Sequence, residues 1–356
     1  MNNEIKFLFK ERKSRISEAL REFLTRPENV ELLELPWGGS LAKKILDYTA
    51  GGKCLRGNLV LLGAEAAGVD LDLEPSYFKA AAAVELFQSG ILMHDDIIDG
   101  DLTRRGRPSA HAEFAEILKN QGVADFRKQG ESVAVCLGDI CLMLTFALLN
   151  ETASDLARLK KVNYFWGREF AKVGDAEIAD TYYSGADVVP SAEAILDLYR
   201  GKTAGYTFRL PLLTGVMLAD GSDDLRNRLD KYAMNLGVVF QIKDDELGIF
   251  GSEDELGKPV GSDIRENKKT IYWQALFSSA TPAEKEELAG IFGHPAPTKE
   301  MVERVRYLLE TKGIRRAVAK LADSLLARAG DALEGLKAPR VAELRQLIAL
   351  SAERRS

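Results

Sequence analysis

The chain has 356 residues, of which 46% are hydrophobic, so it is long enough to bury a large core. Its formal net charge of −6 argues against general affinity for nucleic acids. Three cysteines without C-x-x-C spacing argue against a disulfide framework or a structural zinc site. Charged residues interrupt every apolar run before it reaches bilayer length. We therefore expect a cytoplasmic protein without a transmembrane segment.

Apolar residues recur at helical spacing along most of the chain, and Gly and Pro mark many of the boundaries. We predict helices over residues 4–26, 40–50, 55–68, 75–99, 110–118, 131–150, 153–182, 191–200, 203–219, 222–247, 267–278, 282–291, 298–312, 313–334 and 338–352. A polar loop is expected at 119–130, and no convincing strand pattern is present. The predicted fold class is all-α, with more than ten helices in a single domain over residues 1–356.

The most informative stretch is 87–109, FQSGILMHDDIIDGDLTRRGRPS, where an apolar run carries three acids and ends in a basic segment. On a helix, Asp95 and Asp99 lie one turn apart on the same face, with Asp96 beside them. Carboxylates so close repel one another unless a cation lies between them. Their oxygens suit Mg²⁺, which also binds substrate phosphates, and arginines bind phosphates in a bidentate fork. The stretch therefore predicts a site for Mg²⁺ and a diphosphate.

Three other stretches carry similar chemistry. Residues 240–270 contain a second acidic pair, Asp244 and Asp245, followed by a glycine-rich loop and several lysines. Alone, that pattern is typical of a solvated surface, but its similarity to the first stretch favours a second metal and phosphate site. GGKCLRG at 51–57 combines glycines, which let the backbone approach an anion, with two cations, although a simple turn would look the same. GKTAGYTF at 201–208 lacks P-loop spacing, so a nucleotide site is not supported.

Together these stretches resemble the trans-isoprenyl diphosphate synthases, the family that makes farnesyl, geranylgeranyl and longer prenyl diphosphates. In chain order, the resemblance is carried by GGKCLRG at 51–57, HDDIIDGDLTRRGRPS at 94–109, GKTAGYTF at 201–208, FQIKDD at 240–245 and GKPVGSDIRENKKT at 257–270. It implies a helical bundle around a central cavity and a homodimer. It also implies a prenyltransferase that condenses isopentenyl diphosphate head to tail with an allylic diphosphate, using several Mg²⁺ ions.

The resemblance implies a role for each matching residue. The metal ions would be held by Asp95, Asp96 and Asp99, and from across the cavity by Asp244. The allylic diphosphate would be bound by the cations Arg104, Lys202, Lys258 and Lys268. The diphosphate of isopentenyl diphosphate would be bound by Lys53, Arg56, Gln88 and Arg105. Thr203 and Gln241 would place oxygen dipoles beside the developing cation, and Asp245 would orient the site rather than contact a metal.

One departure from the family pattern concerns the second acidic motif. It reads DDELG, with Gly248 where many members have a third acid. Glu246 points about 200° away from Asp244 on a helix, so it is a poor substitute. The mechanism implied is ionisation of the allylic C–O bond, attack by the double bond of isopentenyl diphosphate and loss of a proton. Water would quench the cation, so we expect the loop 248–262 to close over the site.

Product length is expected to depend on Phe87, Gly90 and Ile91. Ile91 and Gly90 lie four and five residues before Asp95, and Phe87 lies roughly 12 Å along the helix from it. In the family, a bulky residue five before the motif tends to stop the product early, and here that residue is a glycine. We expect the tail to pass Gly90 and stop at Phe87, giving a C20 product first and C25 second. The alternative is that Phe87 is an ordinary core residue.

Two other functions stay open. A class I terpene cyclase also ionises a prenyl diphosphate at an acidic motif, but it needs no second diphosphate site, so Lys53, Arg56 and Arg105 argue against it. A non-catalytic partner subunit of a prenyl synthase would be expected to lose acids or cations, and this chain keeps nearly all of them. The synthase is therefore the preferred hypothesis.

Overall fold

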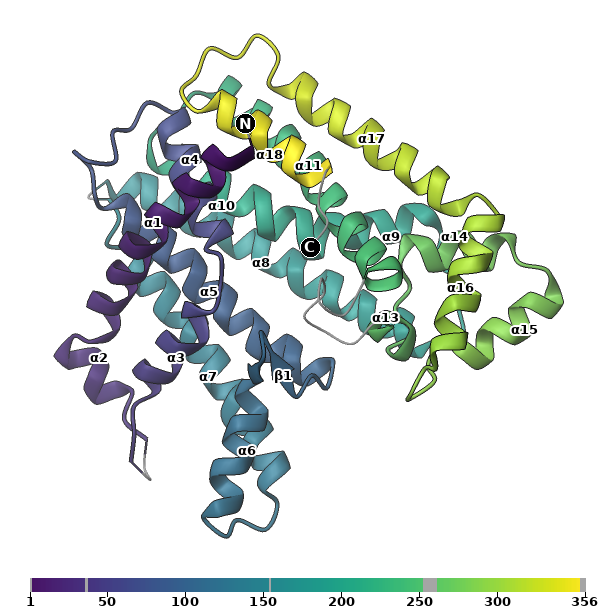
Figure 1. Cartoon of the computed structure of the whole chain (residues 1–356). Helices are drawn as coiled ribbons and strands as arrows, with labels where there is room; N and C mark the ends of the chain where they lie inside the picture. The colour runs from purple at the N-terminus through teal and green to yellow at the C-terminus, as the bar shows by residue number, and fades with distance from the viewer. Residues whose placement is uncertain (1, 36–37, 154, 252–260, 353–356) are drawn as a thin grey trace. The chain divides into compact units, whose positions relative to one another are not determined.

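The computed structural model describes residues 2–35, 38–153, 155–251 and 261–352. More than ten helices make up nearly all of its regular structure, so the predicted all-α class is confirmed (Figure 1). The chain divides into two compact units, one of residues 3–163 and 214–221 and the other of residues 164–213 and 222–356.

The first unit is built around α5 (Tyr77–Ile98), which is buried along most of its length. Four consecutive alanines, residues 80–83, are fully buried and let neighbouring helices approach closely. α5 packs against α3, α4, α6 and α7, as can be followed in Figure 1. The helices of this unit before α8 are α1 (Asn2–Leu24), α2 (Pro27–Leu32), α3 (Leu41–Ala50), α4 (Leu55–Ala66), α5, α6 (Ala110–Asn120) and α7 (Phe126–Leu149).

One face of α7 is buried and the other is exposed and partly apolar. The exposed face includes Val135 and Met143, with exposed fractions of 41% and 63%. Among the described residues, α7 is the one helix long and apolar enough to cross a membrane, and half of its most apolar window is buried inside the protein. Core helices of water-soluble proteins reach the same length and hydropathy, so these properties alone do not place α7 in a membrane.

The second unit is built around α11 (Asp223–Phe250), which packs along the π-helix η1 and against α17. Apolar side chains of α9, α11, α14, α16 and α17 form its core. The remaining elements of the chain are α8 (Leu156–Gly185), α9 (Ala192–Leu198), η1 (Tyr199–Arg209), α10 (Leu210–Leu218), α13 (Ser262–Arg265), α14 (Ile271–Ser279), α15 (Pro282–Ile291), α16 (Lys299–Thr311), α17 (Ile314–Ala332) and α18 (Val341–Ala352).

Two boundary predictions were wrong. The helix predicted over 4–26 ends at Leu24, and the short helix α2, which was not predicted, starts at Pro27, where a missing N–H costs nothing. The predicted polar loop at 119–130 is too long, because α6 continues to Asn120 and α7 begins at Phe126. The polar side chains at the start of α7 face solvent and make that turn look like a loop in the sequence.

The predicted break at Gly201 was also wrong, because the chain stays helical there as η1. Pro211 follows shortly after and has neither an N–H to donate nor room for the carbonyl four residues earlier. A wider helical turn is one way in which a chain relieves such a conflict. Lys202 and Thr203 therefore lie within a π-helix rather than at a helix start.

The only strands among the described residues form a short antiparallel ribbon of β1 (Thr103–Arg104) and β2 (Arg107–Pro108). The two residues between them, Arg105 and Gly106, have φ of 54° and 72°. Positive φ at both central positions is the signature of the type I′ hairpin turn. Strands of two residues are too short to show an alternating hydrophobic pattern, so they were not predicted.

Candidate active site

The first acidic motif lies at the end of α5, and its three acids differ in exposure. Asp95 and Asp99 are half-buried, whereas Asp96 is fully buried. One oxygen of Asp96 accepts a hydrogen bond of 2.7 Å from the Tyr48 hydroxyl, and the other accepts one of 2.6 Å from Nε of Arg104. Burial raises the pKa of Asp96, and these two donors oppose that effect. This geometry argues against a direct metal contact for Asp96, which instead positions Arg104.

Arg104 is held among acids. Its guanidinium lies 3.5 Å from Oδ2 of Asp95 and 3.6 Å from Oδ2 of Asp101, in addition to its contact with Asp96. These charges outweigh burial and raise the pKa of Arg104. The structure thus brings together the predicted metal-binding acids and one predicted phosphate-binding cation. Tyr48 was not predicted, because nothing near it in the sequence points to Asp96.

The half-buried carboxylates of Asp95 and Asp99 are suitable ligands for Mg²⁺. Magnesium usually binds one or two protein carboxylates and completes its shell with water and substrate phosphates. Among the described residues, no three His, Cys, Asp or Glu side chains converge into a complete cage for a metal ion. An ion shared between these two carboxylates and a diphosphate fits this donor set.

The turn at 51–57 differs from its prediction in one respect. The glycines were expected to let the backbone approach an anion, but the side chain of Arg105 occupies that space. A Cβ atom on Gly51 would lie 3.2 Å from Cδ of Arg105, and one on Gly52 would lie 3.2 Å from a guanidinium nitrogen. The glycines therefore make room for Arg105.

Three other residues were predicted to bind the same diphosphate as Arg105. Lys53 is exposed and Arg56 is half-buried, on the same turn. Gln88 is buried one helical turn after Glu85, and its Oε1 has no hydrogen-bond partner among the described residues. A diphosphate oxygen accepts hydrogen bonds, so Gln88 would bind it through the N–H groups of its amide, while Arg105, Lys53 and Arg56 would supply positive charge.

In the second unit, the second acidic motif resembles the first, because one acid of the pair is half-buried and the other is buried. Asp244 is half-buried, and Asp245 is buried. Asp245 accepts hydrogen bonds from the Tyr199 hydroxyl and, at 2.7 Å, from Nε2 of Gln241. The Thr203 hydroxyl donates to Oε1 of Gln241 at 2.6 Å. Burial raises the pKa of Asp245 well above its usual value. These contacts agree with the predicted orienting role of Asp245.

A small cavity of about 90 Å³ collects residues from both basic stretches of the second unit. Among its lining residues, Lys202, Thr203, Gln241 and Lys268 were predicted, whereas Asp180 and Lys269 were missed. Lys202 forms ion pairs of 2.8 Å with Asp180 and 2.7 Å with Glu177, both on α8. The spacing of Glu177 and Asp180, three residues apart on a helix, was a signal that could have revealed this acidic face.

Gly248 stands where many family members have a third acid. The space that a side chain would need at this position is occupied by the carboxylate of Asp263. A Cβ atom at this position would lie 2.5 Å from Oδ2 of Asp263. A larger residue at 248 would therefore have to displace Asp263. Lys258 and most of the predicted flap at 248–262 lie outside the described residues.

The residues predicted to set product length lie on the buried part of α5. Phe87 is fully buried and Ile91 is half-buried. A Cβ atom on Gly90 would lie 2.8 Å from the carbonyl oxygen of Gly138 on α7. On that side, the glycine allows two helices to approach rather than leaving open space, which was not anticipated. The roles of these three residues in product length stay predictions.

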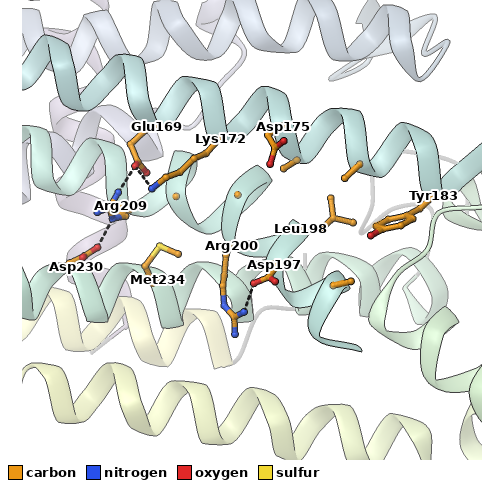
Figure 2. Close-up of a pocket in the computed structure, with 15 residues that line it drawn as sticks. Glu169, Lys172, Asp175, Tyr183, Asp197, Leu198, Arg200, Arg209, Asp230 and Met234 are labelled. Carbon is orange, nitrogen blue, oxygen red and sulfur yellow. Dashed lines mark hydrogen bonds and ion pairs between the residues drawn. The ribbon is translucent and has the colours of Figure 1, made fainter. Parts of the chain in front are cut away.

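A larger cleft of about 570 Å³ lies against other residues of η1 and is shown in Figure 2. Arg209 bonds to Asp230 at 2.5 Å and to Glu169 at 2.5 Å, and Lys172 bonds to Glu169 at 2.8 Å. These pairs link η1 to α8 and α11. The charges in this cleft are largely satisfied by one another, so they serve to hold the π-helix in place.

The fold and the paired acidic motifs define the chain as a helical isoprenoid synthase. Residues 40–311 match the polyprenyl synthetase family. Because this match covers well over half of the chain, the protein belongs to that family and is a prenyltransferase.

Known relatives agree with this assignment. The chain is 34% identical to a geranylgeranyl diphosphate synthase of Saccharolobus solfataricus over 76% of each protein. It is 29% identical to one of Methanosarcina mazei, covering 92% of this chain and 91% of the relative. A solved structure of geranylgeranyl pyrophosphate synthase from Corynebacterium glutamicum, complexed with isoprenyl diphosphate and magnesium, superposes with a TM-score of 0.86 at 28% identity. It covers 97% of this chain and 99% of the other. Magnesium is therefore the expected metal.

Lys269 leads to a prediction about pH. Its Nζ lies 4.1 Å from the centre of the Trp273 ring and 2.9 Å from Oδ1 of Asn267. Burial lowers its pKa to about 8, partly offset by Asp187. Since an ordinary lysine keeps its charge to about pH 10, Lys269 loses its charge at a lower pH than an ordinary lysine does. We expect affinity for inorganic pyrophosphate to fall between pH 7 and 9, which isothermal titration calorimetry would measure.

The matched variant is Lys269→Arg, because a guanidinium stays charged throughout this range. Its pyrophosphate affinity should change less with pH than that of the wild type. Identical pH dependence in the two proteins would exclude Lys269 as the titrating group.

Proposed function

We propose that this chain condenses isopentenyl diphosphate head to tail with an allylic diphosphate, with Mg²⁺, and that its main product is geranylgeranyl diphosphate, C20, followed by C25. The observation that carries the proposal is the divergence of two adjacent arginines. Arg104 contacts Asp95 and Asp96. The side chain of Arg105 instead contacts Gly52, which belongs to the separate basic turn at 51–57. Two anion-binding groups side by side suit a reaction between two diphosphates.

The acids and cations would divide the substrates between them. Asp95 and Asp99 would hold magnesium on the allylic diphosphate, with Asp244 as a further ligand, so we propose more than one ion. When bound, magnesium supplies positive charge that stabilises the departing diphosphate. Arg104, Lys202, Lys258 and Lys268 would bind the allylic diphosphate, and Lys53, Arg56, Gln88 and Arg105 would bind that of isopentenyl diphosphate.

Thr203 and Gln241 are suited to stabilise the allylic cation. Their side-chain oxygens are linked to each other, and Gln241 is anchored to buried Asp245. This chain of hydrogen bonds fixes the dipoles before the reaction, so little reorganisation is needed when charge develops. The amide of Gln241 cannot rotate without breaking both bonds.

We further propose that both compact units act as one functional domain, since the family match at 40–311 runs through both. The assembly we propose is a cytoplasmic homodimer without a transmembrane segment. The exposed apolar face of α7, which includes Val135 and Met143, supports a protein partner for this helix. Its acid Asp139 lies on that face and would be costly to bury in lipid.

The alternatives are less well supported. A terpene cyclase has no need for the separate basic turn with Lys53, Arg56 and Arg105. A non-catalytic partner subunit has no need for the hydrogen-bonded Thr203 and Gln241.

The proposed reaction is tested by incubation with isopentenyl diphosphate, Mg²⁺ and each short allylic primer, followed by product sizing. Asp95→Ala should lower turnover at least about 100-fold, because charge stabilisation of the leaving group is lost. Asp72→Ala, which removes an exposed acid of the same unit, is the control and should keep full activity. Retained activity in Asp95→Ala would refute the metal assignment.

Product length is tested with Phe87→Ala. Removing the ring should shift the product distribution to longer chains, because the tail can then extend further along α5. The control is Phe114→Ala, which removes an equally buried phenylalanine from α6. Each loss costs several kcal/mol, about 3–5, but the ratio of products does not depend on how much enzyme stays folded. An unchanged distribution would make Phe87 an ordinary core residue.

The dimer is tested with Met143→Glu, which places a charge on the exposed face of α7. Analytical ultracentrifugation should show dimers for the wild type and monomers for the variant. Tyr307→Glu, on the exposed side of α16, is the control and should remain dimeric. A monomeric wild type would contradict the proposed assembly, and a species that sediments only in detergent would indicate a membrane contact.

A further inference from the structure

Glu85 is a buried acid in α5 that the proposed chemistry does not use. It lies ten residues before Asp95, and only 6% of its surface is exposed. A carboxylate is costly to bury unless hydrogen bonds and positive charges compensate. The groups that compensate Glu85 are the N–H of Gly57 and two residues of the proposed site for isopentenyl diphosphate, Arg56 and Arg105.

The carboxylate of Glu85 caps the start of α4. Helices leave their first N–H groups without internal partners, and a side chain at the N-cap usually accepts one of them. Here the N-cap is Cys54, which has φ of 51° and makes no such hydrogen bond. Instead, Oε1 of Glu85 accepts the N–H of Gly57 at 2.7 Å, and the N–H of Arg56 acts on the same carboxylate and lowers its pKa. A negative charge at this position also suits the helix dipole.

Close packing fixes this arrangement. A Cβ atom on Gly57 would lie 3.3 Å from Cγ of Glu85 and 3.1 Å from the carbonyl oxygen of Ala81. α4 therefore begins directly against α5, and the turn that precedes it has little freedom to shift.

The positive charges of Arg56 and Arg105 act on the same carboxylate. Burial raises the pKa of Glu85, while the guanidinium groups of Arg56 and Arg105 act in the opposite direction. Both are predicted to bind one diphosphate and would otherwise repel each other when close. A carboxylate beneath them favours an arrangement in which they share one anion.

We propose that Glu85 is a positioning residue for isopentenyl diphosphate: it fixes the start of α4, on which Arg56 lies, and its charge attracts the guanidinium groups of Arg56 and Arg105. This inference rests on the proposed function. It also favours side chains over the N–H groups of Arg56 and Gly57 as ligands of this diphosphate, because Glu85 already accepts from both.

The test compares Glu85→Gln and Glu85→Ala with the wild type in steady-state kinetics. Glutamine keeps an acceptor for the Gly57 N–H but loses the charge, whereas alanine loses both. We expect KM for isopentenyl diphosphate to rise about tenfold in Glu85→Gln and further in Glu85→Ala. KM for the allylic primer should stay within about twofold. Calorimetric titration of isopentenyl diphosphate without a primer should show the same loss of affinity.

Glu65→Gln is the matched control. Glu65 is also buried in this unit, on α4, and pairs with Arg12 at 2.7 Å. Its substitution should lower Tm and leave both KM values unchanged. The inference is overturned if Glu85→Gln leaves KM for isopentenyl diphosphate unchanged, or if both KM values rise together as Tm falls.

The outcomes separate this inference from the proposed function. A wild type that forms no product with any primer would refute the proposed function. In that case the calorimetric titration still tests Glu85, because it requires binding and no reaction. Equal affinities of the wild type and Glu85→Gln would then overturn the inference on its own.

Discussion

The Tyr48 and Tyr199 hydroxyls each donate a hydrogen bond to a buried aspartate, and both candidate sites depend on these contacts. Tyr48 holds Asp96 at the end of α5, and Tyr199 holds Asp245 near the end of α11. A carboxylate inside a protein must find such donors, because its water is gone. Once the second acid of each pair is fixed inward, the rotation of the helix end is fixed as well. The first acid, Asp95 or Asp244, then lies half-buried at the surface.

This division explains why two adjacent acids are not equivalent. In each pair one carboxylate is built into the hydrogen-bonded interior and the other keeps access to solvent. The interior acid in turn orients a side chain with a proposed role, Arg104 in the first unit and Gln241 in the second. The same solution appears twice in one chain, although the two sequences around the pairs share little beyond Asp-Asp.

Much of this molecule could be predicted from its sequence. The helical class follows from spacing, and the acidic and basic stretches identified the site residues that resemblance to a family then assigned. The unequal roles of Asp95 and Asp96 were out of reach, because Tyr48 is distant in sequence and periodicity reports only local neighbours. The capping of α4 by Glu85 is another contact between separate helices. The π-helix could not be foreseen, since Pro211 indicates a disturbed helix without saying how the chain accommodates it.

For several glycines, the sequence pointed to a position where close packing matters but not to the neighbour that requires it. Gly51 and Gly52 were expected to let the backbone approach an anion, but they accommodate the side chain of Arg105. Gly90 was expected to leave room for the product tail, but on one side α7 occupies the space beside it. A glycine indicates a close neighbour, and the three-dimensional structure shows which residue that neighbour is.

Two residues around the basic turn, Cys54 and Arg105, adopt left-handed backbone conformations although neither is glycine. Such conformations cost of order 1 kcal/mol or more each, and here they place cations over one turn. The basic turn and the hairpin that contacts it therefore carry backbone strain. A search for thermostable variants would select glycine at these two positions, because glycine adopts positive φ without steric strain. Under the role proposed for Arg105, a gain in heat resistance at this position would come with a poorer enzyme, so a screen for stability alone would select against activity.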